Sequence, residues 1–194
     1  MSLPLSWLST ARLSLRRFAP TDIDLLCALY EDPAVARFLG GVKTRCECEA
    51  MLRERILDYY AAHPGLGLWV TQRRDSGAAV GLHLLNHIRG EMHIQIGYVL
   101  AAPHWGRGYA TEMARALLQY GFRERGLAQI TAITDPANSA SQHVLEKCGL
   151  HRRGARVLAH PSYAGKPLAR FELDAADWAR AAPPLRAEWR SELA

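Results

Sequence analysis

The chain has 194 residues, of which 49% are apolar and 22% are charged, and its formal net charge is +5. This length and balance are typical of one globular domain and exclude a disordered or fibrous chain. No apolar run approaches the roughly 20 residues that a membrane-spanning helix needs, and no basic and then apolar signal segment opens the sequence. A cytoplasmic location without membrane contact is therefore expected.

The basic residues and the cysteines do not form the patterns of nucleic-acid or metal binding. The arginines are scattered rather than gathered in a dense run, so a nucleic-acid partner is not expected. Cys27, Cys46, Cys48 and Cys148 show no CxxC spacing, and no nearby histidine completes a zinc pattern. We therefore expect no metal site, and an anionic cofactor accounts for the excess positive charge more simply.

The first third of the chain is expected to contain one strand and three helices. Leucines alternating with polar residues predict the strand at 11–18. Three patterns mark helix starts: Thr21 with Asp24, Asp32 with Pro33, and Thr44 with Glu47. The last of these helices is expected to run to about residue 62.

The middle of the chain is predicted to be an antiparallel sheet with strands at 66–72, 79–88 and 91–100. In the last of these strands, Glu91, His93 and Gln95 alternate with apolar residues, which predicts one polar face. That face could line a cleft for a substrate.

The rest of the chain alternates helix and strand before a closing hairpin. The expected elements are a helix at 110–125, a strand at 129–134, a helix to 148 capped by Asn138 or Ser139, and strands at 151–159 and 167–173. A short helix and a tail are expected after residue 175. The order predicts one α+β domain (α/β in some schemes) over residues 1–194, with its core at about 10–178 and a C-terminal tail at 179–194.

A glycine-rich turn, Gly106-Arg-Gly108-Tyr-Ala-Thr111, joins the predicted strand that ends at Leu100 to the helix that follows. Such a turn presents unpaired backbone amides at the positive end of a helix dipole, which is suited to binding phosphate. Thr111 stands where a dinucleotide fingerprint has its third glycine, and no Gly-Lys-Ser or Gly-Lys-Thr follows. A phosphate-bearing cofactor is expected, but neither a Rossmann domain nor a Walker-type nucleotide site.

Four segments resemble the GNAT superfamily of acetyl-CoA-dependent N-acetyltransferases. They are TARLSLRRFAPTDIDLL at 10–26, DPAVARFLGG at 32–41, IGYVLAAPHWGRGYATEMARALLQYGF at 96–122 and NSASQHVLEKCGL at 138–150. The similarity spans roughly residues 10–178 and is strongest to the Rim-type branch, which acetylates ribosomal-protein N-termini and has many relatives with small-molecule substrates. The resemblance implies a mixed, mostly antiparallel twisted sheet flanked by helices, with splayed central strands, and acetyl-CoA as cofactor, released as CoA.

The same resemblance implies which residues hold the cofactor. Trp105 to Ala110 match the pyrophosphate motif, with Trp105 in the place of Gln or Arg, and backbone amides up to Thr111 hold the pyrophosphate. The strand before the turn, bulged at Gly97, pairs its backbone with pantetheine and polarises the thioester carbonyl, and Asn138 contacts the cofactor arm. The implied set is Tyr98, Val99, Leu100, Trp105, Gly106, Arg107, Gly108, Tyr109, Ala110, Thr111, Asn138 and Ser141.

Three residues are candidates for catalysis. By resemblance, Ser141 protonates the departing thiolate, although a place in the first turn of a capped helix also explains it. His93 is the residue on the predicted polar face that titrates near neutral pH. Gln95 stands where many Rim-type relatives carry a Glu, and it cannot take a proton. The base is therefore His93, Glu91 or a chain of water molecules, and the alternative for each side chain is a solvated strand face.

The sequence thus predicts direct acetyl transfer to a primary amine, either a protein N-terminus or a small molecule. Two alternatives remain at this point: an aminoglycoside or polyamine acetyltransferase, and a non-catalytic module that binds acetyl-CoA as a sensor. The amine acceptor is the expected partner, and the sequence leaves homodimer formation open.

Overall fold

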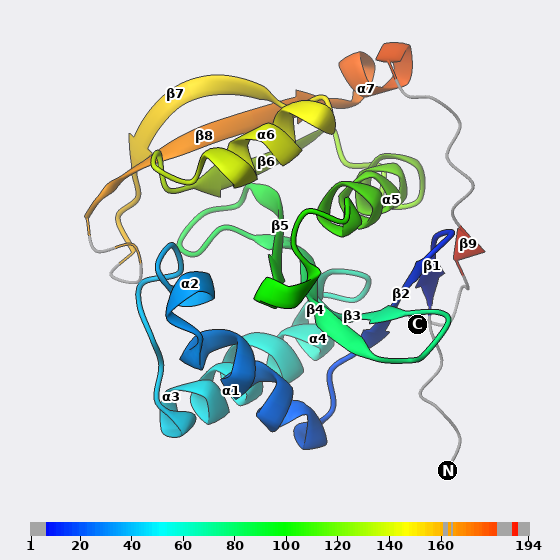
Figure 1. The fold of residues 1–194 in the computed structure, drawn as a ribbon. Helices are drawn as coiled ribbons and strands as arrows, with labels where there is room; N and C mark the ends of the chain where they lie inside the picture. The colour runs from blue at the N-terminus through cyan, green and yellow to red at the C-terminus, as the bar shows by residue number, and fades with distance from the viewer. Residues whose placement is uncertain (1–6, 161–162, 164, 182–187, 190–194) are drawn as a thin grey trace.

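The computed structural model describes residues 7–160, 163, 165–181 and 188–189. These residues form a mixed sheet with the strand order β7-β8-β6-β5-β4-β3-β2-β1-β9 (Figure 1). The strands are β1 (Leu8–Ser9), β2 (Leu13–Arg17), β3 (Gly67–Arg73), β4 (Ala79–His87), β5 (Ile94–Leu100), β6 (Gln129–Thr134), β7 (His151–Val157), β8 (Pro167–Asp174) and β9 (Glu188–Trp189). Every described pairing is antiparallel except that of β5 with β6.

Helices lie before β3, on both sides of β6 in the sequence, and after β8. They are η1 (Pro20–Asp22), α1 (Ile23–Glu31), α2 (Pro33–Ala36), α3 (Arg45–Met51), the π-helical η2 (Leu52–Leu57), α4 (Asp58–Ala62), η3 (Ala102–His104), α5 (Tyr109–Arg123), α6 (Ser139–Lys147) and α7 (Ala175–Ala181). The predicted order of strands and helices from β2 to β8 is confirmed, and so is the mixed, mostly antiparallel sheet. The short strands β1 and β9 were not predicted, and β9 lies within the expected tail, where it pairs with β1.

The first helix begins earlier than its cap pattern predicted. Asp22 accepts a hydrogen bond from the Ala19 amide at 2.8 Å and forms a bidentate pair with Arg16 at 2.6 and 2.7 Å. Asp24, the expected partner of Thr21, is exposed and pairs instead with Arg45. The expected cap was therefore wrong, because a buried arginine on β2 selects Asp22. The other two cap patterns, at Asp32 and Thr44, are confirmed.

Two apolar clusters cover the sheet. One joins buried residues of β2–β6 and β8 to α5 and α6, and includes Trp69, Leu117 and Phe171. The other lies beneath α1, α3 and η2, and includes Leu26 and Ile56. Among the described residues, no helix is long and apolar enough to cross a bilayer. The helices thus pack by one apolar side against the sheet.

The sheet is split between β5 and β6. The two parallel strands pair at Gln95 with Thr131, and the Thr131 hydroxyl donates to the Ile94 carbonyl at 3.0 Å. Beyond that point they diverge (Figure 1), so the predicted splay is confirmed. The predicted bulge at Gly97 is wrong, because the β4–β5 register runs without a shift and Gly97 packs opposite Leu84. The splay arises on the β6 side of the strand and needs no bulge.

Candidate active site

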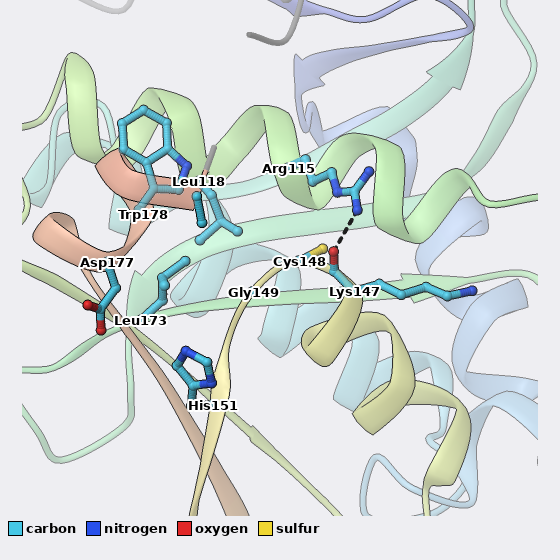
Figure 2. Close-up of a pocket in the computed structure, with 10 residues that line it drawn as sticks. Arg115, Leu118, Lys147, Cys148, Gly149, His151, Leu173, Asp177 and Trp178 are labelled. Carbon is cyan, nitrogen blue, oxygen red and sulfur yellow. Dashed lines mark hydrogen bonds between the residues drawn. The ribbon is translucent and has the colours of Figure 1, made fainter. Parts of the chain in front are cut away.

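A cavity of about 220 Å³ lies between α5, the end of α6 and α7 (Figure 2). Arg115, Leu118, Cys148 and Trp178 are among its lining residues, and Arg115 donates a hydrogen bond to the Lys147 carbonyl at 2.6 Å. None of the lining residues belongs to the glycine turn or to β5. The cavity is therefore separate from the residues that the sequence indicates for cofactor binding.

The glycine turn has the geometry of an anion cradle. Gly106 and Gly108 have φ values of 71° and 76°, in the left-handed region that glycine adopts without strain. Gly108 is the N-cap of α5, and no side chain caps the helix, so the first-turn amides of Tyr109, Ala110 and Thr111 have no cap partner. The turn itself is exposed. A negatively charged ligand would satisfy these amides at the positive end of the dipole.

Trp105 attaches the turn to the end of β5. Its indole Nε1 donates a hydrogen bond to the Leu100 carbonyl at 2.7 Å, while 49% of the residue remains exposed. β6 does not pair with this end of β5, so the indole N–H takes the place of a strand partner for the Leu100 carbonyl. Trp105 holds the turn in place, a role that the sequence pattern did not reveal.

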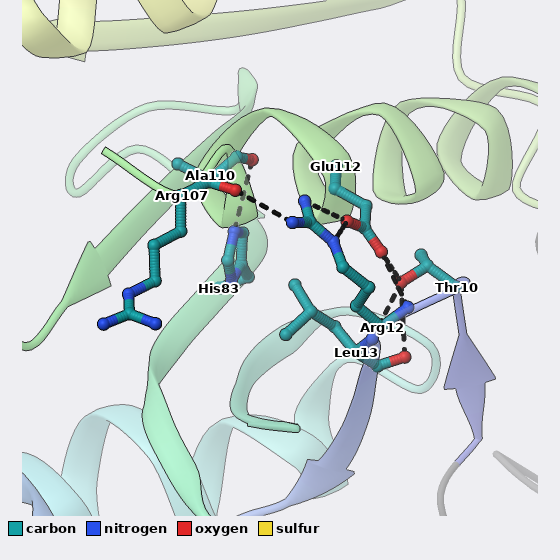
Figure 3. A network of polar contacts seen from close by, with 7 residues as sticks. All are labelled: Thr10, Arg12, Leu13, His83, Arg107, Ala110 and Glu112. Carbon is teal, nitrogen blue, oxygen red and sulfur yellow. Dashed lines mark hydrogen bonds and ion pairs between the residues drawn. The ribbon is translucent and has the colours of Figure 1, made fainter. Parts of the chain in front are cut away.

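A polar network fixes α5 against the loop between β1 and β2 (Figure 3). The Glu112 carboxylate accepts hydrogen bonds from Thr10 Oγ1 at 2.6 Å and from Arg12 Nε at 2.6 Å. Arg12 Nη1 also donates to the Arg107 carbonyl at 3.0 Å, so one guanidinium bridges the helix and the glycine turn. Sequence reasoning missed this network, because its members lie about 100 residues apart and only an acidic residue in the first turn hinted at it.

The Glu112 carboxylate gives a prediction for pH. Burial alone raises the pKa of Glu112, but the hydrogen bonds from Thr10 and Arg12 outweigh it, so the pKa lies below the ordinary 4.5. The stabilisation is therefore complete above pH 4.5 and lost as the pH falls through the lower folded-state pKa. We expect Glu112→Gln to lower the free energy of unfolding by about 1–2 kcal/mol at pH 7.

Urea unfolding from pH 7 to pH 3 measures this effect. The gap between the wild type and Glu112→Gln should narrow on acidification, whereas Glu146→Gln, a change at an exposed position on α6, should differ little from the wild type throughout. A gap that stays constant with pH would show that the carboxylate charge contributes nothing.

The electrostatic environment of the turn is positive. Burial, and then the charges of Arg107 and Arg73, lower the pKa of His104 at the start of the turn. Figure 3 shows the Arg107 guanidinium extending away from Glu112, and no ion pair joins it to another described residue. Arg73 pairs with Asp75, so it is Arg107, beside an uncapped helix start, that favours an anionic ligand.

His83 lies beneath the first turn of α5 and is fully buried. Its Nδ1 is 2.7 Å from Thr71 Oγ1, and its Nε2 is 3.4 Å from the Ala110 carbonyl oxygen. Burial lowers the pKa of His83 to about 3, so the imidazole is neutral at physiological pH. Its contacts support the helix start, and it does not exchange protons near neutrality.

The ladder between β4 and β5 decides which backbone groups of β5 are available. The Ala101 amide donates to the Val80 carbonyl at 3.0 Å, so the main-chain groups of Ala101 point toward β4. Along an antiparallel ladder the direction alternates from one residue to the next, so every second residue of β5 points the same way. The main-chain groups of Val99 therefore face β4, and those of Tyr98 and Leu100 face the split. The expectation for the Val99 backbone needs correction, because its amide and carbonyl are committed to the sheet.

Tyr98 and Ser141 meet across the split. The Tyr98 hydroxyl donates to the Ser141 carbonyl at 2.9 Å and lies 3.2 Å from Ser141 Oγ. Asn138 caps α6, with its Oδ1 accepting from the Ser141 amide at 3.1 Å, which confirms the predicted cap. Because Asn138 performs the capping, the Ser141 hydroxyl is directed at Tyr98 rather than at the helix backbone.

His93 does not lie on a strand as expected. β5 begins at Ile94, and Met92, one of the apolar residues of the predicted alternation, is 86% exposed. The preceding turn is longer than the sequence indicated, since the Glu91 amide donates back to the Ile88 carbonyl at 3.0 Å. His93 is an exposed residue that pairs with the Glu91 carboxylate at 3.0 Å. The expected polar strand face was wrong for Glu91 and His93.

Gln95 lies on β5 and is tied to the neighbouring strand. Its Nε2 donates to Asn86 Oδ1 at 3.2 Å. Gln95 precedes Tyr98 by three residues, roughly 10 Å along a strand. Neither Gln95 nor His93 has a hydrogen bond to Ser141 or to the glycine turn in the described structure. The predicted catalytic residues are thus not all brought together, and Tyr98 with Ser141 forms the polar centre of the split.

Comparisons with known proteins agree with this geometry. Residues 12–151 match the model of the acetyltransferase (GNAT) domain. YkkB of Bacillus subtilis, an uncharacterized protein, is 35% identical over 149 residues, covering 74% of this chain and 84% of YkkB.

Two solved structures share the fold. A GNAT-family acetyltransferase from Bacillus anthracis has a TM-score of 0.73 at 24% identity, over 88% of this chain and 99% of the other. The spermidine N-acetyltransferase of Vibrio cholerae, solved with CoA and spermine, has a TM-score of 0.69 at 19% identity, over 88% and 99%. Together with the matched domain and the uncapped start of α5, these findings show that the chain belongs to the GNAT family and is an acetyl-CoA-dependent N-acetyltransferase.

Proposed function

We propose that this enzyme transfers the acetyl group directly to a primary amine, with the pyrophosphate of acetyl-CoA held by the first-turn amides of α5. The observation that carries the proposal is the uncapped helix start behind Gly108, beside a split that exposes the backbone of β5. When bound, acetyl-CoA supplies the acetyl group as a thioester. Tyr98 and Leu100 offer backbone amides on the side of the split, where they can orient the thiol arm and its carbonyl.

Ser141 is proposed to hold the proton that the departing thiolate needs. Because the Tyr98 hydroxyl donates its proton to the Ser141 carbonyl, the Tyr98 oxygen can accept from the Ser141 hydroxyl and hold it in the split. On reaction the serine proton turns from Tyr98 to the thiolate sulfur, and water, which has taken the amine proton, returns a proton to the serine oxygen. Burial raises the pKa of Tyr98, so the phenol keeps its own proton at physiological pH. The pair thus forms a positioned proton donor in the split.

We assign removal of the amine proton to solvent water. Among the described residues, the side chains near the split offer no titrating base: Gln95 cannot take a proton, and His83 is buried and neutral. The Glu91 carboxylate is engaged by His93 and by Arg156 at 3.0 Å each. Placing the chain in the Rim-type branch is likewise part of this proposal, and it rests on the Asn138-to-Ser141 segment.

The substitution Gly108→Val tests whether the glycine turn binds the cofactor. A valine there would carry a branched side chain at a positive φ and cover the amides, so we expect acetyl-CoA to bind at least 10-fold more weakly. Gly126 is a matched control, since it has φ 61° at the other end of α5 and open space around it. Calorimetric titration with acetyl-CoA should show normal affinity for Gly126→Val.

Unchanged affinity for folded Gly108→Val would argue against the cradle. Thiol release from acetyl-CoA, measured over peptides and small amines, tests turnover separately. Tight binding of acetyl-CoA by the wild type with no release on any amine would favour a non-catalytic sensor instead.

A further inference from the structure

Four segments converge at the end of β5 that lies farthest from the glycine turn. The Arg89 amide, at the β4–β5 turn, donates to the hydroxyl of Tyr163 in the β7–β8 loop at 3.2 Å. Arg55 on η2 lies close enough to Arg89, Tyr163 and Tyr30 of α1 for their charges to interact. β5 therefore runs from the cofactor cradle at one end to a cluster of arginines and tyrosines at the other.

Arg55 has no partner for its charge in the part of the chain that the structure describes. It is half-buried, and no hydrogen bond or ion pair joins it to any of the described residues. The adjacent Glu54 pairs with Arg53 instead. Four other buried or half-buried arginines each bond an acid or a carbonyl: Arg16, Arg73, Arg115 and Arg170. A half-buried cation without an anion is unfavourable unless a ligand supplies the missing negative charge.

Two further observations indicate a role for Arg55 in binding. It lies within a π-helical segment between α3 and α4, and such segments occur frequently at functional sites because they redirect side chains. Burial, and to a smaller extent the neighbouring charge of Arg89, lower the pKa of Arg55. Lys43 adds positive charge, with its Nζ 5.7 Å from the centre of the Tyr30 ring.

We propose that Arg55, with Arg89 beside it, binds an anionic group of the acceptor, so that the amine acetylated here also carries a carboxylate or a phosphate. Guanidinium groups match both anions through paired hydrogen bonds. The same charges repel polycations such as spermidine or an aminoglycoside. This inference rests on the proposed function, since it names the class of amine that the enzyme accepts.

Amines of matched size test the inference by steady-state kinetics. The probes are 4-aminobutyrate, O-phosphoethanolamine and putrescine, together with two peptides that share an N-terminal serine and differ by Glu or Lys at the second position. We expect the acidic amines to give the higher kcat/KM, with the first two probes distinguishing carboxylate from phosphate. Arg55→Gln should raise KM for them about 10- to 100-fold with little change in kcat, and Arg55→Lys should restore part of the loss.

Arg53→Gln is the matched control, because Arg53 precedes Arg55 on the same helix, is 70% exposed and pairs with Glu54. It removes the same charge and should leave KM unchanged. A wild type that prefers putrescine or the Lys peptide would overturn the inference, and so would equal KM values for Arg55→Gln and Arg53→Gln.

Product binding separates this inference from the proposed function. The CoA-loaded protein is titrated with N-acetylglutamate and with N-acetylputrescine, which requires no turnover. Tighter binding of N-acetylglutamate that is lost in Arg55→Gln supports the anion site even if no amine is acetylated. Equal binding of the two products would contradict it even if the enzyme turns over.

Discussion

Replacing Ser141 by alanine is expected to lower kcat by about 100-fold, within the range for loss of a positioned acid. Within the described part of the chain, the Ser141 hydroxyl has a side-chain hydrogen bond only with Tyr98, and Asn138 caps the helix without it. The substitution should therefore leave the helix and the acetyl-CoA affinity intact. Thiol-release kinetics and calorimetry on the same preparation measure both quantities.

Ser139→Ala is the control for that experiment, because Ser139 is an exposed residue in the same first turn of α6. It should keep the kcat of the wild type. Tyr98→Phe, which removes the group that orients the serine hydroxyl, should give an intermediate loss. Equal kcat values for Ser141→Ala and the wild type would remove the serine from the mechanism.

Replacing Gly81 by alanine is expected to destabilise the fold by about 4 kcal/mol or more, the range of severe core defects. A Cβ at this position would lie 2.1 Å from the Val99 carbonyl oxygen and 2.7 Å from the Leu100 Cα, and φ is 147°. These atoms belong to the backbone of β5 and cannot move without opening the β4–β5 ladder. Loss of β5 also removes the strand that carries Tyr98.

Gly77→Ala isolates the conformational part of this effect. Gly77 also has a positive φ, 69°, but a Cβ there would meet nothing within 4 Å. It should cost only about 1 kcal/mol, from the left-handed backbone alone. Urea unfolding measures the free energy of unfolding of both variants. Similar losses of stability would contradict the account, because they would show that a Cβ at residue 81 does not clash with the backbone of β5.

Much of the fold could be predicted because its signals are local. The capping box of Thr44 with Glu47 and the cap of α6 by Asn138 each involve residues within a few positions of one another. The first cap failed for the opposite reason, because Arg16 on β2 selects Asp22 through a contact that no short pattern contains.

The candidate site likewise has features that a short sequence pattern predicts and features that depend on contacts between distant residues. The glycine turn was visible in the sequence because the left-handed positions at Gly106 and Gly108 follow from chain geometry. Arg12 and Glu112, which support that turn, lie about 100 positions apart in the sequence. No short sequence pattern contains both residues, so their contact could not be predicted. The charge cluster at Arg55 is hidden for the same reason. His93 was misplaced because polar and apolar residues also alternate through the turn that precedes β5.

The most direct test compares two acetyl thioesters by calorimetry on the wild-type protein: acetyl-CoA, and S-acetylpantetheine, which has the same arm without the pyrophosphate and adenosine. Acetyl-CoA is expected to bind one molecule per chain, and S-acetylpantetheine at least 100-fold more weakly, because the uncapped start of α5 holds the pyrophosphate. Equal affinities, or no saturable binding of acetyl-CoA by the folded protein, would contradict the assignment of this turn as the cofactor cradle.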